Sequence, residues 1–314
     1  MNWKIYNRIK VKALTLADVY TIFILSIFTL LAIIFFSKLS NSLALISQNV
    51  IVIIAIYFLA YIASKENAPK LLILFRRLYF ALMIYYVYDQ AQYYIRVTNP
   101  YLYDDILIKW DYALFGTNPT QWLSKLSFPA FTEYLQLSYM LYFFMPLLHG
   151  TEIHYRGKEG QFDEFSRMIT FSFYMSYLLY FIMPAIGPRF TLHDFSQMNT
   201  DLPGLWLTNF FREFINTGGS IPHYAIHPDI LVNRDCMPSG HTWLTMVNMI
   251  MAFRYRSKFK WFFLVFGSSL IFSTIYLRYH YVVDVLAGVT CVILAIRLEP
   301  KILKLSFFNA SSKI

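Results

Sequence analysis

Long apolar runs alternate with short polar segments along almost the whole chain. A helix that crosses a bilayer needs about 20 mostly apolar residues. Eight runs approach or reach that length: residues 18–37, 43–63, 78–95, 131–148, 168–186, 241–254, 261–277 and 281–298. The pattern predicts an all-α fold, a polytopic membrane helix bundle of about eight transmembrane helices.

Composition excludes the other broad classes of protein. Of the 314 residues, 57% are hydrophobic and 14% are charged, whereas a soluble domain carries about 25% charged residues. This balance excludes a soluble globular domain, a disordered chain and a disulfide-stapled secreted module. The two cysteines are predicted to lie in an outer loop (Cys236) and deep in a helix (Cys291), so we expect no disulfide.

Lysine and arginine collect in alternate connecting segments. If both termini are cytoplasmic, the inner segments hold 19 of the 27 Lys and Arg residues, as the positive-inside rule requires. The net charge of +9 is then a topology signal, and we expect no nucleic-acid partner and no obligate protein partner. The first span follows a basic stretch from Lys4 to Lys12. The apolar run is long and no small-residue cleavage site follows it, which favours a retained helix over a signal peptide.

Two predicted outer segments are long, residues 96–130 and 187–240. Connections of that length usually have a function or a structure of their own. Within the second, apolar residues recur at helical spacing from Leu207 to Ile215, with Arg212 on the other face. This spacing predicts a short amphipathic helix, which either lies in the outer membrane interface or packs on the bundle.

Ionisable residues at a membrane edge are costly and therefore mark candidate sites. The first is Arg189, which follows Pro184, Gly187 and Pro188 at the exit of the fifth span. Its permanently charged, planar guanidinium suits phosphate oxygens. The alternative is an interfacial arginine that anchors the helix among lipid headgroups.

The second candidate is Pro238-Ser239-Gly240-His241, where the sixth span begins. Ser239 can cap the helix, and Gly240 allows a ligand to approach the backbone. The free N–H groups and positive dipole end of a helix N-terminus favour a phosphate. Alternatively, His241 is a surface histidine at a capped helix start.

The third candidate is the pair His280 and Asp284, whose i, i+4 spacing predicts one shared helix face. A bare carboxylate one turn into an apolar run needs a partner. Asp284 can accept from one ring nitrogen of His280 and leave the other as a nucleophile or base. A purely structural His–Asp pair is the alternative.

Taken together, the three groups suit phosphoester chemistry. Arg189 and the helix N-terminus would neutralise the phosphoryl oxygens. His280 would attack phosphorus and carry the phosphoryl group. His241 would protonate the leaving oxygen and then deprotonate the acceptor.

Other chemistries fit these residues less well. A metal site needs three or four converging ligands, and the candidates would be Cys236, His241, His280 and Asp284. The serine and glycine beside His241 are better explained by a phosphate, so we expect no metal and no cofactor. The Cys-x₅-Arg spacing of Cys291 and Arg297 lies in an apolar helix without a glycine-rich loop. A transporter would carry its ionisable residues near the midplane.

Pro-Ser-Gly-His at 238–241, followed by His-x-x-x-Asp at 280–284, resembles the type 2 phosphatidic acid phosphatase superfamily of membrane lipid phosphatases and phosphotransferases. The resemblance covers about residues 100–298 and implies a core of six helices, formed by spans three to eight. The segment 111–122 is similar to stretches that precede the core motifs in the inositol phosphorylceramide synthase-like branch.

The resemblance implies a role for each residue of the two motifs. His280 would be the nucleophile and Asp284 its orienting acid. His241 would be the general acid. Ser239 and Gly240 would bind phosphate.

The chain departs from the family pattern in two places. The first motif of the family is Lys-x₆-Arg-Pro, whereas here proline precedes Arg189 and Ile182 occupies the lysine position. In the third motif, Thr274 stands where the family usually has an arginine. Arg278 is nearby but out of register, and we include it among the substrate-binding candidates. These departures resemble the transferase branches, the inositol phosphorylceramide and sphingomyelin synthases.

The resemblance implies a lipid phosphotransferase that cleaves a membrane lipid phosphoester through a phosphohistidine and passes the phospho-headgroup to a lipid hydroxyl. The alternatives are a lipid phosphate phosphatase, with water as acceptor, and a non-catalytic lipid-binding or transport protein. We expect both termini in the cytoplasm and the site on the extracytoplasmic side. The expected parts are residues 1–70 (basic segment and two accessory helices), 71–300 (catalytic core with both outer loops) and 301–314 (cytoplasmic tail).

Five polar residues of the second outer segment are further candidates for binding a polyol headgroup. The alternative is that most are ordinary solvated loop residues. They are His193, Asp194, His223, His227 and Asp229.

Overall fold

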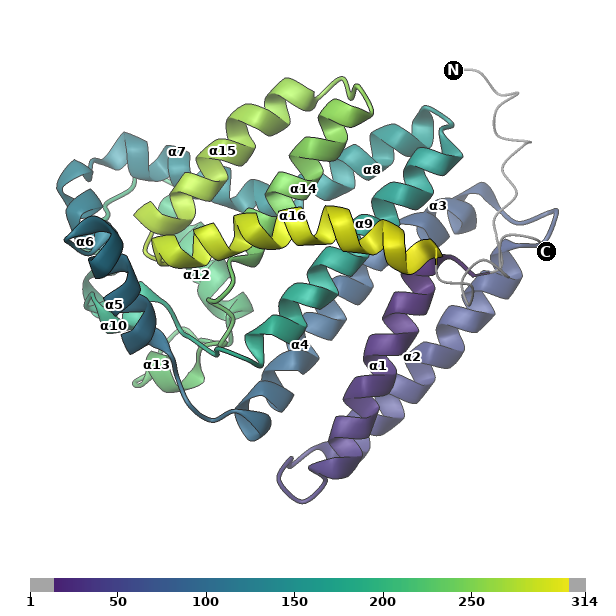
Figure 1. The fold of residues 1–314 in the computed structure, drawn as a ribbon, viewed down its shortest axis with the longest axis horizontal. Coiled ribbons are helices and arrows are strands. Elements are labelled where there is room, and N and C mark those ends of the chain that lie inside the picture. Colours follow the sequence, from purple (N-terminus) through teal and green to yellow (C-terminus); the bar gives the residue numbers. More distant parts are fainter. Residues whose placement is uncertain (1–13, 305–314) are drawn as a thin grey trace. The chain divides into compact units, whose positions relative to one another are not determined.

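The computed structural model describes residues 14–304, which form helices and turns with no β-strand (Figure 1). The basic residues Lys4 to Lys12 and most of the predicted tail lie outside the described residues. By its contacts the chain divides into two compact units. The first contains the residues up to 98, residues 146–177 and the end of the chain from 299, and the second contains 99–145 and 178–298.

The first unit contains the longest apolar helices. They are α1 (Leu16–Ile34), α2 (Ser42–Ala63), α3 (Lys70–Leu78) and α4 (Phe80–Thr98), with most of α8 (Met145–Tyr155) and α9 (Glu159–Tyr180). α1 packs against both α2 and α4. A capping box starts α1, because Thr15 and Asp18 each accept the backbone N–H of the other.

Buried ion pairs tie the helices of this unit together. Asp18 of α1 pairs with Arg76 of α3, and Glu299 pairs with Arg167 of α9. Tyr79 also donates to Asp18. Removing one partner of a buried pair leaves an uncompensated charge. These contacts therefore hold α1 to α3, and Glu299 to α9.

The second unit contains all three motif segments. Its helices are α5 (Asp104–Phe115), α6 (Pro119–Leu123), α7 (Pro129–Met140), α10 (Pro188–Thr191), α11 (Met198–Asp201), α12 (Thr208–Gly218), α13 (Pro228–Leu231), α14 (Gly240–Arg254), α15 (Lys260–Tyr276) and α16 (Val282–Lys304) as far as residue 298. α15 packs against both α7 and α14. The motif segments lie at the starts of α10, α14 and α16.

Within residues 14–304, each of the eight apolar runs contains helical structure, although the run 168–186 leaves the helix at Tyr180. In the same range, three helical stretches are long and apolar enough to cross a membrane. These are α1, α2 and the stretch Lys70–Thr98, while α15 is apolar but shorter. The count of about eight spans stays a prediction. The run 131–148 is not one helix, because α7 ends at Met140 and a 3₁₀ turn precedes α8. Pro146 in the first turn of α8 cannot donate the hydrogen bond that a continuous helix requires.

Both long outer segments fold into helices, α5 and α6 in the first and α10 to α13 in the second. The amphipathic helix predicted from Leu207 onward is α12. Phe210 and Phe214 are exposed, whereas Arg212 is buried and donates to the backbone oxygens of Met198 and Leu202. α12 therefore packs on the unit through its arginine side and presents phenylalanines outward.

Candidate active site

Two distant segments meet where α14 and α16 begin. Ser239 caps α14, because its Oγ accepts the backbone N–H of Thr242 at 3.2 Å. The backbone N–H of Ser239 donates to the backbone oxygen of Asp284 at 3.0 Å. α16 approaches closely at Gly288, where a Cβ would lie 2.8 Å from the backbone oxygen of Ser239. The second and third motifs are therefore held together by backbone contacts.

The three predicted catalytic residues lie together in this place. Nδ1 of His280 lies 3.5 Å from Oδ2 of Asp284, and Nε2 of His280 lies 3.2 Å from Nδ1 of His241. Asp284 is fully buried, His280 is 4% exposed and His241 is partly exposed. Each ring nitrogen of His280 thus has a different predicted partner.

The local structure differs from the predicted one in one respect. α16 begins two residues after His280, so this histidine lies in the preceding turn and not on a shared helix face with Asp284. The pair forms because Asp284 turns back toward the helix start, where its Oδ2 accepts the backbone N–H of Tyr281 at 2.9 Å. The backbone oxygen of Thr274 accepts the N–H groups of both Tyr279 and His280 at 2.9 Å, which fixes the turn from the other side.

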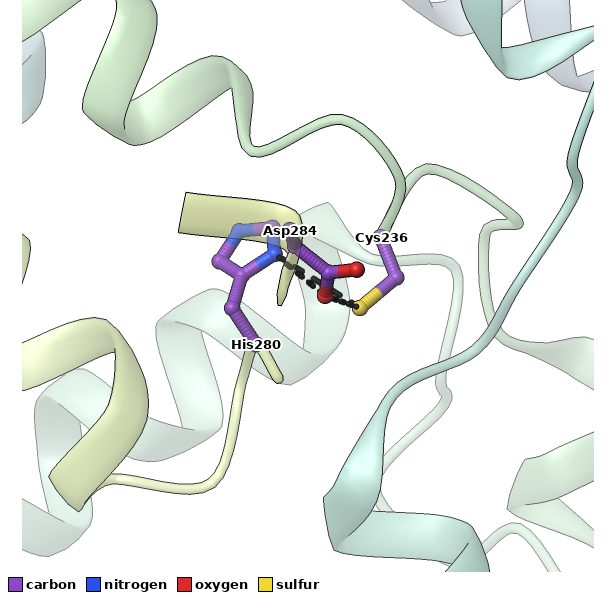
Figure 2. A group of neighbouring side chains, drawn as sticks. All are labelled: Cys236, His280 and Asp284. Atoms are coloured by element: carbon purple, nitrogen blue, oxygen red, sulfur yellow. Dashed lines mark hydrogen bonds and ion pairs between the residues drawn. The ribbon is translucent and has the colours of Figure 1, made fainter. Parts of the chain in front are cut away.

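Cys236 completes the buried side of the pair, as Figure 2 shows. Its Sγ lies 2.8 Å from Oδ2 of Asp284 and 3.5 Å from Nδ1 of His280. It also lies 3.4 Å from the backbone oxygen of Tyr279. Burial holds the pKa of the thiol well above its usual range, so Cys236 is a protonated donor to Asp284. Cys236 and Cys291 are both free and buried.

Aromatic rings contact His241. Its ring lies close to those of Tyr139 and Tyr142, with centroid distances of 4.7 and 4.3 Å. Tyr139 in turn stacks on Tyr279 at 4.6 Å. Because α7 supplies Tyr139 and the turn after it supplies Tyr142, the predicted acid is oriented by an element that carries none of the motifs.

Arg189 of α10 lies over the ring of Tyr279. Its guanidinium is 5.0 Å from the centre of that ring and donates to Oδ1 of Asn216 at 2.9 Å. The backbone N–H of Arg189 donates to the backbone oxygen of Arg278 at 3.0 Å, which joins the first motif to the third. Among the described residues no carboxylate pairs with Arg189, so its charge is available to an anion.

The side chain of Arg278 is already engaged. It is 2% exposed, and its guanidinium donates to Oδ2 of Asp201 at 2.8 Å and to Oγ of Ser124 at 3.1 Å. Its backbone is in the left-handed region, with φ of 66°, which a non-glycine residue adopts only at a cost. The structure thus assigns this arginine an ion pair, and its predicted contact with substrate stays a prediction.

Two carboxylates of α5, neither of them among the predicted site residues, hold the motif backbones. Asp104 accepts the N–H groups of Ile186 and Gly187, with Oδ1 at 2.8 Å from the Gly187 nitrogen. Asp111 accepts the N–H groups of Val282 and Val283, both at 2.9 Å. Burial raises the pKa of both carboxyls, while the backbone donors oppose this shift. Two acids seven residues apart on one helix are the only local signal for this arrangement.

The five loop residues named above do not gather into one group of contacts. His193 shares a hydrogen bond of 3.0 Å with Thr120, and burial together with the charge of Arg278 lowers its pKa to about 4. Asp194 caps the turn at Ser196. His223 pairs with Glu213 on the surface, and His227 and Asp229 are exposed.

A family model of the PAP2 superfamily matches residues 105–298. The chain belongs to the PAP2 superfamily. All three motif segments lie inside the matched range. No curated protein and no solved structure matches the chain.

Membership of the PAP2 superfamily indicates a membrane protein with an activity of the lipid phosphatase or phosphotransferase type. The apolar helices α1, α2 and α3–α4 agree with a membrane protein. The match is to the superfamily as a whole and identifies no branch within it.

Proposed function

We propose that this PAP2 protein is a lipid phosphotransferase that moves a phospho-headgroup from a membrane lipid to a lipid hydroxyl, as inositol phosphorylceramide synthases do. The proposal rests on one observation above all. Asp284, His280 and His241 form a continuous series of contacts through Nδ1 and Nε2 of His280. This order assigns a role to both ring nitrogens of His280 and to Nδ1 of His241.

The assignment begins at the buried carboxylate. Asp284 accepts the Nδ1–H of His280, so Nε2 of that neutral ring carries a lone pair. The contact of 3.2 Å between this Nε2 and Nδ1 of His241 then requires the hydrogen to be on His241. A nucleophile and a proton donor therefore face each other, and a phosphoryl group bound between the rings replaces their hydrogen bond.

The reaction follows in two displacements. Nε2 of His280 attacks phosphorus, and the bond from phosphorus to the leaving oxygen breaks. His241, in its doubly protonated imidazolium form, gives its Nδ1 proton to that oxygen and becomes neutral. The acceptor hydroxyl then gives its proton to His241, and its oxygen attacks phosphorus and releases His280. Asp284 stabilises the ring while it is positively charged.

Charge supports a phosphodiester as the substrate. A phosphomonoester carries nearly two negative charges at neutral pH, and a phosphodiester carries one. This chain lacks the lysine and the arginine of the family motifs at Ile182 and Thr274, and Asp201 neutralises Arg278. Arg189 and the start of α14 then face the phosphoryl oxygens, which suits the single charge of a diester.

Burial supports a lipid hydroxyl as the acceptor. His280 is 4% exposed, and the rings of Tyr139 and Tyr142 lie against the His241 ring. An apolar, enclosed site favours an amphiphilic acceptor over bulk water. A transferase also requires that water be kept from the phosphohistidine.

The test is mass spectrometry of lipids in host membranes that express the wild type or His280→Ala, supplied with ceramide and phosphatidylinositol. A new phospholipid present only with the wild type supports the transferase and identifies both substrates. A dephosphorylated lipid with free phosphate would instead establish a phosphatase. Identical lipid profiles would favour a binding or transport protein.

We place the site on the extracytoplasmic side, because that orientation puts 19 of the 27 Lys and Arg residues inside. The exposed phenylalanines of α12 would then lie in the outer interface. Cysteines introduced at the exposed positions Ser196 and Arg256 test this orientation. A membrane-impermeant maleimide should label the first in intact cells, and the second only after lysis; the reverse pattern would invert the topology.

A further inference from the structure

Three different metal-binding atoms converge on the buried side of His280, away from the nitrogen that faces His241. They are Sγ of Cys236, Nδ1 of His280 and Oδ2 of Asp284, all within 4.8 Å of one another (Figure 2). The three residues are 3%, 4% and 0% exposed. A thiol, an imidazole and a carboxylate are the three ligand types that zinc prefers.

These three side chains make more close polar contacts than they have hydrogens to donate. Sγ of Cys236 has one proton but lies within 3.5 Å of three polar atoms, on Asp284, His280 and Tyr279. Nδ1 of His280 has one proton and faces both Asp284 and Cys236. A single cation between Sγ, Nδ1 and Oδ2 would accept one lone pair from each of these three atoms.

The distances are close to those of tetrahedral zinc. Zinc bonds of about 2.3 Å to sulfur and 2.0–2.2 Å to nitrogen and oxygen separate the donor atoms by about 3.4–3.6 Å. The observed separations are 3.5 Å from Cys236 to His280 and 3.5 Å from His280 to Asp284. Only the 2.8 Å hydrogen bond between Cys236 and Asp284 has to open, by about 0.7 Å on the same bond lengths.

We propose that Cys236, His280 and Asp284 form an inhibitory site for Zn²⁺ or another thiophilic divalent cation. The cation replaces the thiol proton, which leaves to solvent, and takes the lone pair of Nδ1 after the ring proton has moved to Nε2. His280 stays neutral, but Nε2 now carries a hydrogen in place of its lone pair. It donates this hydrogen to Nδ1 of His241, whose own hydrogen moves to its Nε2. The inhibitory part of this inference rests on the proposed function, whereas cation binding does not.

The site opposes catalysis, in contrast to a catalytic metal centre. A catalytic zinc presents an open position to the substrate while its ligands stay bound. Here the ligand is the nucleophile itself, so occupancy removes the lone pair that attacks phosphorus. Hard cations such as Mg²⁺ and Ca²⁺ prefer oxygen ligands, so we expect neither to bind this sulfur-containing group.

Binding is tested with Co²⁺, which takes zinc sites and gives a near-ultraviolet charge-transfer band when a thiolate coordinates it. The full chain in detergent micelles is titrated with Co²⁺ as wild type, Cys236→Ser and Cys291→Ser. Cys291 is the matched control, because it is the other free, buried cysteine. We expect the band in the wild type and in Cys291→Ser, and its loss in Cys236→Ser. No band in the wild type, or a band that persists in Cys236→Ser, overturns the site.

Inhibition is tested by adding Zn²⁺ to the lipid turnover assay, with each variant compared to its own rate without metal. Loss of a partner outside the ligand shell already costs 10- to 100-fold in metal affinity. We therefore expect the half-inhibitory Zn²⁺ concentration to rise at least about tenfold in Cys236→Ser and to stay unchanged in Cys291→Ser. Equal sensitivity of all three proteins overturns the inhibitory role. If no turnover is found in the wild type, the proposed function fails, while the Co²⁺ band still decides the site.

Discussion

Asp111→Asn tests whether α5 positions the catalytic turn from outside the motifs. The Asp111 carboxylate is 1% exposed and accepts two backbone N–H groups at the start of α16. Asparagine keeps one acceptor oxygen but turns an N–H₂ group toward the other donor. One N–H then loses its partner, at a cost of about 1–3 kcal/mol, and the helix loses a negative charge at its N-terminus, worth about 0.3–1 kcal/mol.

The expected loss of stability is therefore about 1–4 kcal/mol. For a unit of this size that corresponds to a drop of roughly 3–15 °C in the unfolding midpoint. The same donors belong to Val282 and Val283, which lie between His280 and Asp284 in the sequence. Because a misplacement of about 1 Å can cost 100-fold in rate, we expect kcat to fall about 10- to 100-fold, with a smaller change in KM.

The assays are thermal unfolding in detergent and lipid turnover measured well below the unfolding midpoint. Asp105→Asn is the control, because it makes the same charge change on the exposed neighbour in the same helix. If Asp111→Asn matches Asp105→Asn in both assays, the hydrogen bonds to α16 have no energetic role. If only the midpoint falls and kcat is retained, Asp111 stabilises the unit without positioning the site.

Four further perturbations test the proposed mechanism. His280→Ala should abolish turnover to every acceptor, and more than a trace of transfer would exclude a phosphohistidine. Asp284→Asn should lower kcat by at least about 100-fold with a retained unfolding midpoint; pure destabilisation would make the pair structural. EDTA should not lower turnover, and an inhibition by EDTA that one divalent ion reverses would indicate a catalytic metal. The pKa of His193 is lowered to about 4, so its contribution to stability is complete above about pH 6.5 and is lost as the pH falls toward 4. His193→Gln should therefore flatten the decline of the unfolding midpoint between pH 7 and 4.5, and a decline as steep as in the wild type would refute this assignment.

The elements and the central residues could be predicted from local pattern. Apolar runs specify helices through their own composition, and every predicted run contains helical structure, although not every run is one continuous helix. His241, His280 and Asp284 could be chosen because ionisable residues at the end of an apolar helix need partners. In the structure His280 contacts both Asp284 and His241, so these residues are partners of one another.

The supporting residues could not be predicted, because their partners are distant in the sequence and lie in the backbone. Asp111 accepts from residues 171 and 172 positions away. An acid in a polar outer segment has the same local appearance whether it is solvated or buried. Cys236 is a similar case, since only the folded loop brings its sulfur to Asp284. A backbone N–H has no side-chain identity, so a pattern of residue types contains no signal for its acceptor.

Arg278 gives the clearest example of a residue whose side chain and backbone act separately. Its charge made it a candidate for the missing arginine of the third motif, but its guanidinium pairs with Asp201. Its backbone oxygen accepts the N–H of Arg189, and this contact would survive most substitutions of the side chain. Likewise, the backbone oxygen of Thr274 holds the turn at His280 although the family arginine is absent there. The departures from the family pattern therefore leave the scaffold of the proposed nucleophile intact and remove positive charge from the proposed phosphate site. A phosphodiester, with one charge to neutralise, needs less of that charge than a monoester does, and for this reason we take the same departures as support for the proposed headgroup transfer.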